Sequence, residues 1–165
     1  GVGSRAASLI IYILKQWNNP PFFIGVEPRS ANCLFESIKA GHRLSVESEE
    51  TTIMAGLNCG SLSTLGWEIL KNSLIGSISI SDKLTEEAMR ALAYPLPGDP
   101  VIVSGESGAS GLAGLIGLCN TDKFGTFKKK IDLNKSSKVL VINSEGDTDP
   151  LNYQRIVAEN LKDNS

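Results

Sequence analysis

The stretch GVGSRAASLIIYILKQWNNPPFFIGVEP, residues 1–28, decides the fold class. Apolar residues recur at helical spacing from Ala6 to Trp17, directly after Gly3-Ser4, and predict an amphipathic helix. The residues Asn18-Asn19-Pro20-Pro21 end that helix, and the apolar run from Phe22 to Val26 predicts a buried strand. A helix joined to a strand by a short connection is typical of an α/β fold.

The same alternation continues along the whole chain. Further strands are predicted at residues 42–46, 77–80, 101–103 and 138–142, and further helices at residues 30–39, 64–72, 82–93, 109–119 and from 150 onward. Ser30 and Asp149 are predicted N-caps. We therefore expect one α/β domain over residues 1–165, with a parallel twisted sheet of about five strands and helices on both faces.

Ligands bind such sheets at the carboxyl ends of the strands. The turns at residues 104–108 and 143–149 each follow a predicted strand, and the loop at residues 1–4 enters the first helix. All three are therefore expected on one rim of the sheet.

Composition excludes several classes of function. A net charge of −2 with 21% charged residues leaves no basic stripe, so no nucleic-acid partner is expected. The longest strongly apolar run, residues 6–14, is far shorter than the roughly 20 residues that span a bilayer, so no membrane partner is expected either.

Three cysteines without CxxC spacing fit neither a disulfide framework nor a zinc site, and a reducing cytoplasm is the expected location. Cys119 ends an apolar helix and is expected in the core. Because the first residue is not Met and the chain opens inside a functional turn, we expect further sequence upstream.

The turn Gly1-Val2-Gly3-Ser4 opens a helix, where free backbone N–H groups and the helix dipole can hold a phosphate. A packing turn is the alternative interpretation. With Ala6 the turn also matches G-x-G-x-x-A, and Glu27 stands where a ribose-binding acid would fall in a dinucleotide fold. The dinucleotide interpretation requires a strand before Gly1.

Two acidic positions are candidates for chemistry. Glu106 lies between two glycines at a strand end, where its carboxylate could touch a cofactor or could cap the next helix. Asp147 and Asp149 invite a metal interpretation, but one of them is the expected N-cap and no histidine accompanies them. No metal is therefore predicted.

Six motifs in one order carry a family resemblance. They are GVGS, VEP, TIMAGLNCG, GWEIL, VSGESGASG and VLVINSEGDTDP. Together they resemble the C-terminal portion of the diaminopropionate ammonia-lyases, which are fold-type II enzymes that use pyridoxal phosphate. The resemblance implies the large-domain portion of a tryptophan synthase β-like fold. It also implies a homodimer and elimination of 2,3-diaminopropionate, a small amino acid, to pyruvate and ammonia.

The resemblance also assigns residues. It implies that backbone amides of Gly1, Val2, Gly3 and Ser4 hold the cofactor phosphate and that Gly56 lies near the ring, with Glu106 beside the cofactor. The partner of the pyridine nitrogen maps onto Asn143, with Ser144 adjacent, and relatives use Ser or Thr there.

Two further consequences concern residues that are missing or replaced. The lysine that forms the Schiff base lies upstream of the glycine loop in this family, so the chain carries no catalytic residue of its own and is expected to be inactive alone. Some related dehydratases bind a metal through a Glu, a backbone carbonyl and an Asp; Glu27 and Ala31 match, but Cys33 replaces the Asp. No metal is expected there, and whether Cys33 pairs with Cys59 is left open.

Two alternatives remain at this point. One is another fold-type II enzyme, such as a serine or threonine dehydratase, which would share the fold and the cofactor. The other is a nucleotide-binding module that uses the GVGSRA turn without catalysis.

Overall fold

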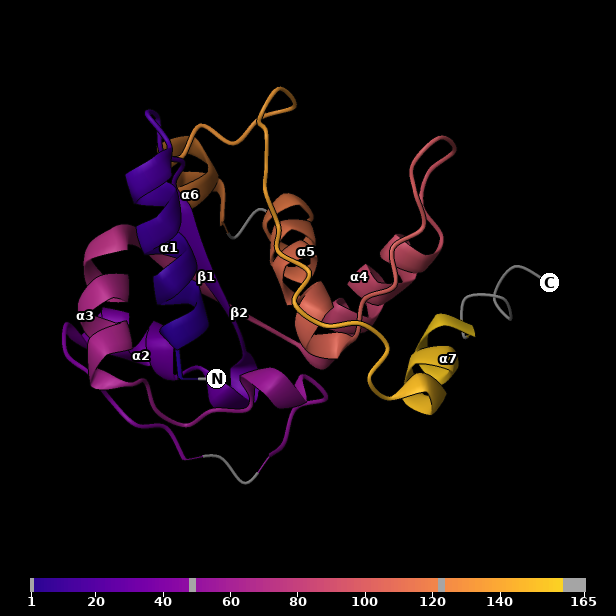
Figure 1. Ribbon diagram of the computed structural model, residues 1–165, viewed down its shortest axis with the longest axis horizontal. Helices are drawn as coiled ribbons and strands as arrows, with labels where there is room; N and C mark the ends of the chain where they lie inside the picture. Colours follow the sequence, from indigo (N-terminus) through magenta and orange to yellow (C-terminus); the bar gives the residue numbers. More distant parts are fainter. Residues whose placement is uncertain (1, 48–49, 122–123, 159–165) are drawn as a thin grey trace. The chain divides into compact units, whose positions relative to one another are not determined.

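The structure is a computed structural model that describes residues 2–47, 50–121 and 124–158. The chain forms two compact units, residues 1–79 and residues 80–165. Figure 1 shows their helices and strands. The elements in chain order are α1 (Ser4–Gln16), β1 (Phe23–Pro28), η1 (Arg29–Ala31), α2 (Cys33–Ala40), η2 (Ala55–Leu57), α3 (Thr64–Ser73), β2 (Leu74–Ile80), α4 (Asp82–Ala93), α5 (Glu106–Cys119), α6 (Gly125–Lys130) and α7 (Pro150–Ala158).

The first unit is built around a pair of parallel strands. β1 and β2 are hydrogen-bonded neighbours although α2 and α3 separate them in sequence. The Ser77 hydroxyl adds a bond to the Gly25 carbonyl across the pair at 3.3 Å. A Cβ at Gly25 would lie 2.7 Å from Leu34 Cδ2, so the glycine lets α2 pack closely on β1.

Apolar faces of α1, α2 and α3 form the core of the first unit. Its buried members are Ala7, Ile10, Cys33, Leu34, Leu62, Trp67 and Leu70. The helical spacing of the apolar residues in α1 explains which face is buried. Gly41, at φ +76°, ends α2. The Ser63 hydroxyl caps the start of α3 by accepting from the Gly66 N–H at 3.0 Å.

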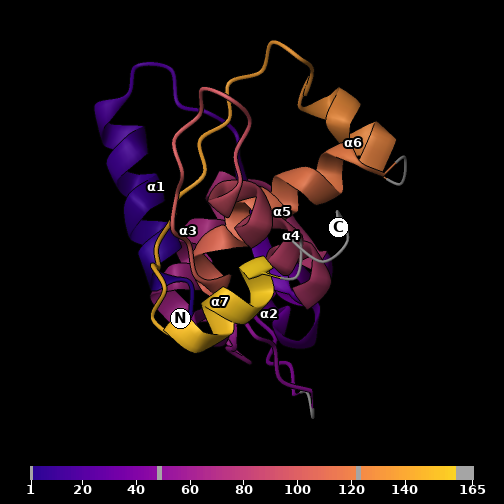
Figure 2. The ribbon, with the colours of Figure 1, turned by 90° about the vertical axis from the view of Figure 1, so that its right-hand side faces the viewer.

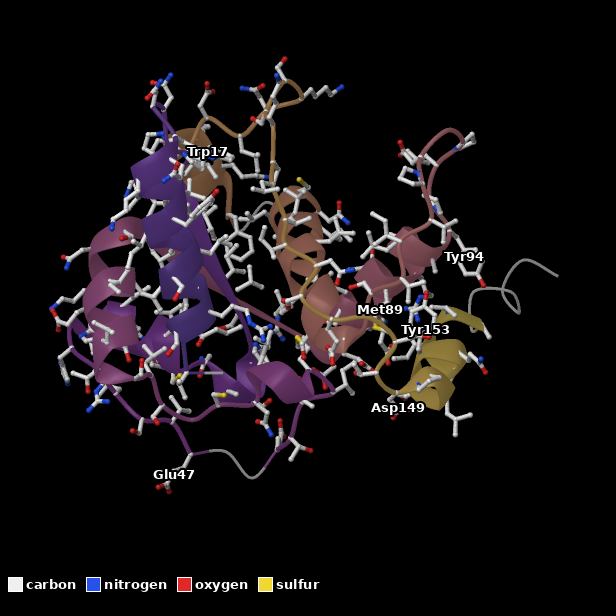
Figure 3. All side chains as sticks on the ribbon, viewed as in Figure 1. Trp17, Glu47, Met89, Tyr94, Asp149 and Tyr153 are labelled. Carbon is white, nitrogen blue, oxygen red and sulfur yellow. The ribbon has the colours of Figure 1, made fainter. Side chains whose placement is uncertain are left out.

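The second unit is mainly helical among its described residues. α4 packs against α5 and α7, with Ala88 and Met89 of α4 fully buried. Figures 1 and 2 both show α7 beside α4, and Arg90 Nη1 donates to the Ile156 carbonyl at 3.2 Å. Figure 3 labels Met89 and Tyr153 in this region. Burial raises the pKa of Tyr153, and Asp147 and Tyr94 raise it further.

The structure confirms the parallel α/β class and most helices, but three predicted strands are wrong. Residues 42–46 form only one antiparallel bridge, between Ser45 and Ser61. Residues 101–103 and 138–142 are extended, and Figure 1 draws both as a trace without an arrow. A strand requires hydrogen bonds to a neighbouring strand, and in the described part of the chain only β1 and β2 form such a pair. The described residues therefore form two strands, where five were expected.

Two smaller predictions are also wrong. Ser30 lies in η1, and α2 begins three residues later, after Asn32, with no side-chain cap. Cys119 ends α5 as predicted, but its side chain is exposed. By contrast, Asp149 Oδ1 accepts from the Asn152 N–H at 3.1 Å, which confirms the predicted cap of α7.

Among the described residues, no helix is both long enough and apolar enough to cross a membrane.

Candidate functional site

The N-terminus of α1 is an open helix end. Val2 has φ +28° and Gly3 has φ +84°, so the chain enters the helix through a left-handed turn. The first helical bond runs from the Ala7 N–H to the Gly3 carbonyl at 3.0 Å. No side chain caps this end and its first turn holds no acid. The amides of residues 4–6 thus have no acceptor in the part of the chain that the structure describes, which suits an anion.

The start of α3 fixes this turn in place. The Ser63 N–H donates to the Val2 carbonyl at 2.9 Å, and the Ser4 and Ser63 hydroxyls lie 3.3 Å apart. A Cβ at Gly66 would lie 3.2 Å from the Val2 carbonyl oxygen. Ser63 was not predicted as a site residue, because nothing local in the sequence shows that it meets the glycine turn. Gly1 lies outside the described residues.

Gly56 occupies the exposed middle of η2 in the same unit. The loop is anchored by Met54, whose side chain is fully buried and whose N–H donates to Thr52 Oγ1 at 3.1 Å. The structure thus presents backbone at this position on the surface of the first unit.

In the second unit, the two predicted rim turns do meet. Ser104 Oγ donates to Asn143 Oδ1 at 3.1 Å, and Asn143 Nδ2 donates to the Val103 carbonyl at 3.0 Å. The Gly105 N–H donates to the Glu145 carbonyl at 3.1 Å. These bonds show that residues 104–108 and residues 143–149 lie together, although the strands predicted before them are not formed. The placement of the glycine turn on the same rim stays a prediction.

The N-terminus of α5, unlike that of α1, is filled from within the chain. Glu145 Oε2 accepts from the Ser107 N–H at 2.8 Å, and Glu145 Oε1 accepts from the Thr148 hydroxyl at 2.8 Å. Glu145 therefore makes the capping bond that the sequence offered as the alternative role of Glu106. The signal was available as an acid in SEGDTDP, but it requires knowing that this turn faces α5.

Glu106 is buried at the first position of α5, with 7% of its surface exposed. Its Oε1 accepts from Asn152 Nδ2 of α7, and Asn152 Oδ1 in turn accepts from Arg155 Nε at 3.1 Å. The carboxylate is thus oriented by a neighbouring helix. Asn152 and Arg155 were not predicted, because 46 residues separate Asn152 from Glu106.

Asn143 and Ser144 differ in how much of their bonding capacity is used. Asn143 Oδ1 accepts from Ser104 Oγ and, at 3.3 Å, from the Glu145 N–H, while Asn143 Nδ2 is held by Val103. The exposed Ser144 hydroxyl has no hydrogen bond to the part of the chain that the structure describes. Asn143 ties the two turns together, whereas Ser144 is available to a ligand.

Comparison with known proteins decides the family. Residues 1–145 match the family described as pyridoxal-phosphate dependent enzyme. The chain belongs to that family. It is also 40% identical over 160 residues to the diaminopropionate ammonia-lyase of Escherichia coli K12, covering 96% of this chain and 40% of that protein. The chain thus spans about two fifths of the relative's length.

Solved structures agree on the fold. The Escherichia coli diaminopropionate ammonia-lyase in complex with an aminoacrylate-PLP azomethine reaction intermediate superposes with a TM-score of 0.86 at 39% identity, over 97% of this chain and 40% of that one. Maize serine racemase superposes with a TM-score of 0.74 at 23% identity, over 99% of this chain and 46% of that one, and supports the fold alone.

The residues at the start of α1 fit the phosphate end of pyridoxal phosphate. A phosphate needs several N–H donors and no nearby carboxylate, and the start of α1 offers both. Four lysines of the helices α1 to α4 are exposed: Lys15, Lys39, Lys71 and Lys83. Lys71 pairs with Glu68 at 2.8 Å and Lys39 with Glu36 at 3.9 Å, as expected for solvated helix faces.

The pair Glu27 and Cys33 forms a closed cluster at the start of α2. Glu27 accepts from the Leu34 N–H at 2.9 Å and the Phe35 N–H at 2.8 Å, and Cys33 Sγ lies 3.8 Å from the carboxylate. Burial raises the pKa of the Glu27 carboxyl. Burial, together with the nearby charge of Glu27, raises the pKa of the Cys33 thiol to about 12. Cys33 and Cys59 are both free thiols, and no group of three metal-ligating side chains occurs among the described residues.

Proposed function

We propose that this chain is the C-terminal, cofactor-holding part of an ammonia-lyase that converts 2,3-diaminopropionate to pyruvate and ammonia. The identity to the Escherichia coli enzyme over nearly the whole chain carries the proposal. Bound pyridoxal phosphate supplies an electron sink for the carbanion that forms when the substrate loses its Cα proton.

The open end of α1 binds the cofactor phosphate through the amides of Gly1, Val2, Gly3 and Ser4. Support comes from the left-handed turn at Gly3 and from an N-terminus without a cap or an acid. The helix dipole adds attraction for a dianion at this end. Ser63 positions the turn by holding the Val2 carbonyl, at 2.9 Å.

Ser144, rather than Asn143, bonds the pyridine nitrogen. The exposed hydroxyl of Ser144 supports this assignment. The bonds that the Asn143 side chain makes with Ser104, Val103 and Glu145 also support it, since they leave one N–H of the amide. Asn143 is then a positioning residue that sets the turn carrying Ser144. A neutral partner at this nitrogen keeps the ring less electron-withdrawing than an acid would, which suits elimination.

Gly56 and Glu106 complete the part of the site that this chain supplies. The exposed backbone at Gly56 can approach a flat ring closely, because glycine has no Cβ. The buried Glu106 carboxylate, fixed by Asn152, lies beside the cofactor in this proposal. The lysine and the group that removes the Cα proton belong to the missing N-terminal part of the same enzyme. The complete enzyme is a cytoplasmic homodimer.

A chimera tests the proposal. In it, this chain replaces the matching segment of Escherichia coli diaminopropionate ammonia-lyase, which supplies the rest of the enzyme. We expect visible absorbance from bound cofactor and formation of pyruvate and ammonia from 2,3-diaminopropionate. Ammonia should be released far more slowly from serine or threonine. The 165-residue chain alone should form no pyruvate. Light scattering should give twice the chimera's mass.

Two outcomes would count against the proposal. Cofactor absorbance with a preference for serine or threonine would favour the dehydratase alternative. A folded chimera without cofactor absorbance would contradict the assignment of the phosphate site.

A further inference from the structure

A chain of hydrogen bonds links the exposed surface of α7 to the buried Glu106 carboxylate. Arg155 donates from Nε and Nη2 to Asn152 Oδ1, at 3.1 Å and 2.9 Å, and Asn152 Nδ2 donates to Glu106 Oε1. We call these three residues the α7 relay. Exposure falls along it, because Arg155 is exposed, Asn152 is half-buried and Glu106 is buried. The relay therefore runs from solvent to an acid inside the second unit.

Arg155 fixes the direction in which the Asn152 amide faces. A guanidinium group offers only N–H donors, so the Asn152 atom beside it must be the oxygen. The amide nitrogen is then the atom that faces Glu106, and it can only donate. Because the Arg155 side chain is exposed, solvent screens its charge, and the direction of its hydrogen bonds is what matters.

The relay gives the two oxygens of the Glu106 carboxyl group different roles. Oε1 accepts from Asn152, so it carries no proton toward that neighbour. Oε2 has no hydrogen bond to the part of the chain that the structure describes. Polar groups of buried side chains normally have partners, so Oε2 points to a ligand that bonds there. The carboxyl group is thus held at one oxygen and available at the other.

The helix that carries the relay is itself anchored at both ends. Asp149, which Figure 3 labels at the start of α7, accepts from the Asn152 N–H at 3.1 Å. Further along α7, Ile156 is fully buried, and its carbonyl accepts from Arg90 Nη1 of α4 at 3.2 Å. A side chain held by an anchored helix can keep a functional group in one orientation, as precise binding requires.

Glu106 and Ser144 lie on two turns that are bonded to each other. The Ser107 N–H donates to Glu145 Oε2 at 2.8 Å, and these two residues directly follow Glu106 and Ser144 in the sequence. The acid at the start of α5 and the hydroxyl proposed to meet the pyridine nitrogen therefore belong to one local arrangement.

We propose that Asn152 and Arg155 are positioning residues of the cofactor site, which hold Glu106 so that its Oε2 bonds the cofactor. The relay also directs any proton on this carboxyl group to Oε2, because Oε1 already accepts from an N–H. This inference rests on the proposed function, since it takes pyridoxal phosphate to be the ligand at Glu106.

The chimera with the Escherichia coli enzyme provides the test. Asn152→Asp keeps the size of the side chain but replaces its N–H donor with an oxygen, so that two carboxyl groups face each other. We expect kcat to fall by about tenfold or more while the KM for 2,3-diaminopropionate stays within about threefold. The visible absorbance band of the bound cofactor should change, and the melting temperature should fall.

The control Asn120→Asp makes the same chemical change at the exposed C-terminal end of α5. Because this side chain lies outside the relay, kcat should stay within about twofold and the absorbance band should not move.

A double variant separates positioning from stability. Combining Asn152→Asp with Glu106→Gln exchanges donor and acceptor, so that the new amide donates to the new carboxylate while Arg155 keeps its acceptor. The melting temperature should return to within about 2 °C of that of the unsubstituted chimera. Neither kcat nor the absorbance band should recover, because the carboxyl group at the cofactor is gone.

Three outcomes would overturn the inference. An unchanged kcat and absorbance band in Asn152→Asp would show that the relay does not act on the cofactor. Recovery of kcat together with the melting temperature in the double variant would make Glu106 and the relay purely structural. Both outcomes leave the proposed function standing. An unsubstituted chimera without cofactor absorbance would instead contradict the proposed function and, with it, this inference.

Discussion

The N-termini of α1 and α5 begin alike in sequence, after glycine, yet they differ in what fills them. At α5 the Glu145 carboxylate accepts from the Ser107 N–H, whereas the α1 end has neither a side-chain cap nor an acid in its first turn. The start of α2 resembles α5, because Glu27 accepts from the amides of Leu34 and Phe35. Helix ends that the chain satisfies itself are structural. Of these three helix ends, the start of α1 is left open and is therefore suited to an external anion.

The largest expected effect comes from filling the open end. Ser4→Asp in the chimera places a carboxylate about 5 Å from a bound phosphate, and their repulsion at an effective dielectric of about 20 is about 3 kcal/mol. Cofactor affinity should fall about 100-fold in an absorbance titration. The helix itself should not suffer, because an acid at this position is favourable.

The neutral variant Ser4→Asn is the matched control and should retain affinity within about tenfold. Equal losses of cofactor affinity in Ser4→Asp and Ser4→Asn would mean that the size of the side chain at this position, and not its charge, determines binding.

The next effect concerns the turn that opens α1. Gly3→Ala forces alanine into a left-handed conformation, and its Cβ would lie 2.8 Å from Leu70 Cδ1. We expect the free energy of unfolding to fall by about 2 kcal/mol or more in urea. Gly41→Ala is the control, because Gly41 shares the left-handed φ but has nothing within 4 Å of the added Cβ.

The free energy of unfolding of Gly41→Ala should therefore fall by only about 1–2 kcal/mol, which is the strain of alanine in a left-handed conformation. A Gly3→Ala cost no greater than that of Gly41→Ala would show that the turn is not packed as described.

A smaller effect is expected at the filled end. Glu145→Ala removes the cap of the Ser107 N–H and should destabilise the chain by about 1 kcal/mol, measured by urea unfolding. Glu87→Ala, at an exposed position of α4, is the control and should change stability by less than about 0.5 kcal/mol. Equal changes would mean that Glu145 is no more than a surface residue.

The smallest effect is a pH dependence at α2. Burial raises the pKa of Glu27 above 4.5, so the fold favours the neutral carboxyl. The stability from this group is therefore present below about pH 4.5 and is lost as pH rises through the raised pKa. Glu27→Gln lacks this titration. The stability of the variant relative to the natural chain should improve as pH rises from about 4 to about 7.

A constant difference would contradict the raised pKa. The variant should also be less stable at every pH by a constant amount. The Leu34 and Phe35 N–H groups bond to different oxygens of Glu27, and glutamine has an NH2 group in place of one of them.

Local signals predicted the helices well and the strands poorly. Residues 82–93 were predicted as a helix and α4 has those bounds, because a cap at Ser81 and the proline at Pro95 mark its ends locally. The apolar runs at 101–103 and 138–142 have strand-like composition, but a strand also needs a neighbour, which a local pattern cannot reveal.

The candidate site divides in the same way. The open turn at Gly3 followed from glycine and helix periodicity. The roles of Glu145, Asn152 and Ser63 did not, because each acts on a residue far away in the sequence. The choice between Asn143 and Ser144 likewise needed the partners of the Asn143 amide.

The crystal structure of the chimera with pyridoxal phosphate tests the account most directly, because it shows which helix end holds the phosphate. The account predicts phosphate oxygens within hydrogen-bond distance of the amides at Gly3 and Ser4, with Glu145 still bonded to the Ser107 N–H. Phosphate at the start of α5, with the Glu145 carboxylate displaced, would contradict it.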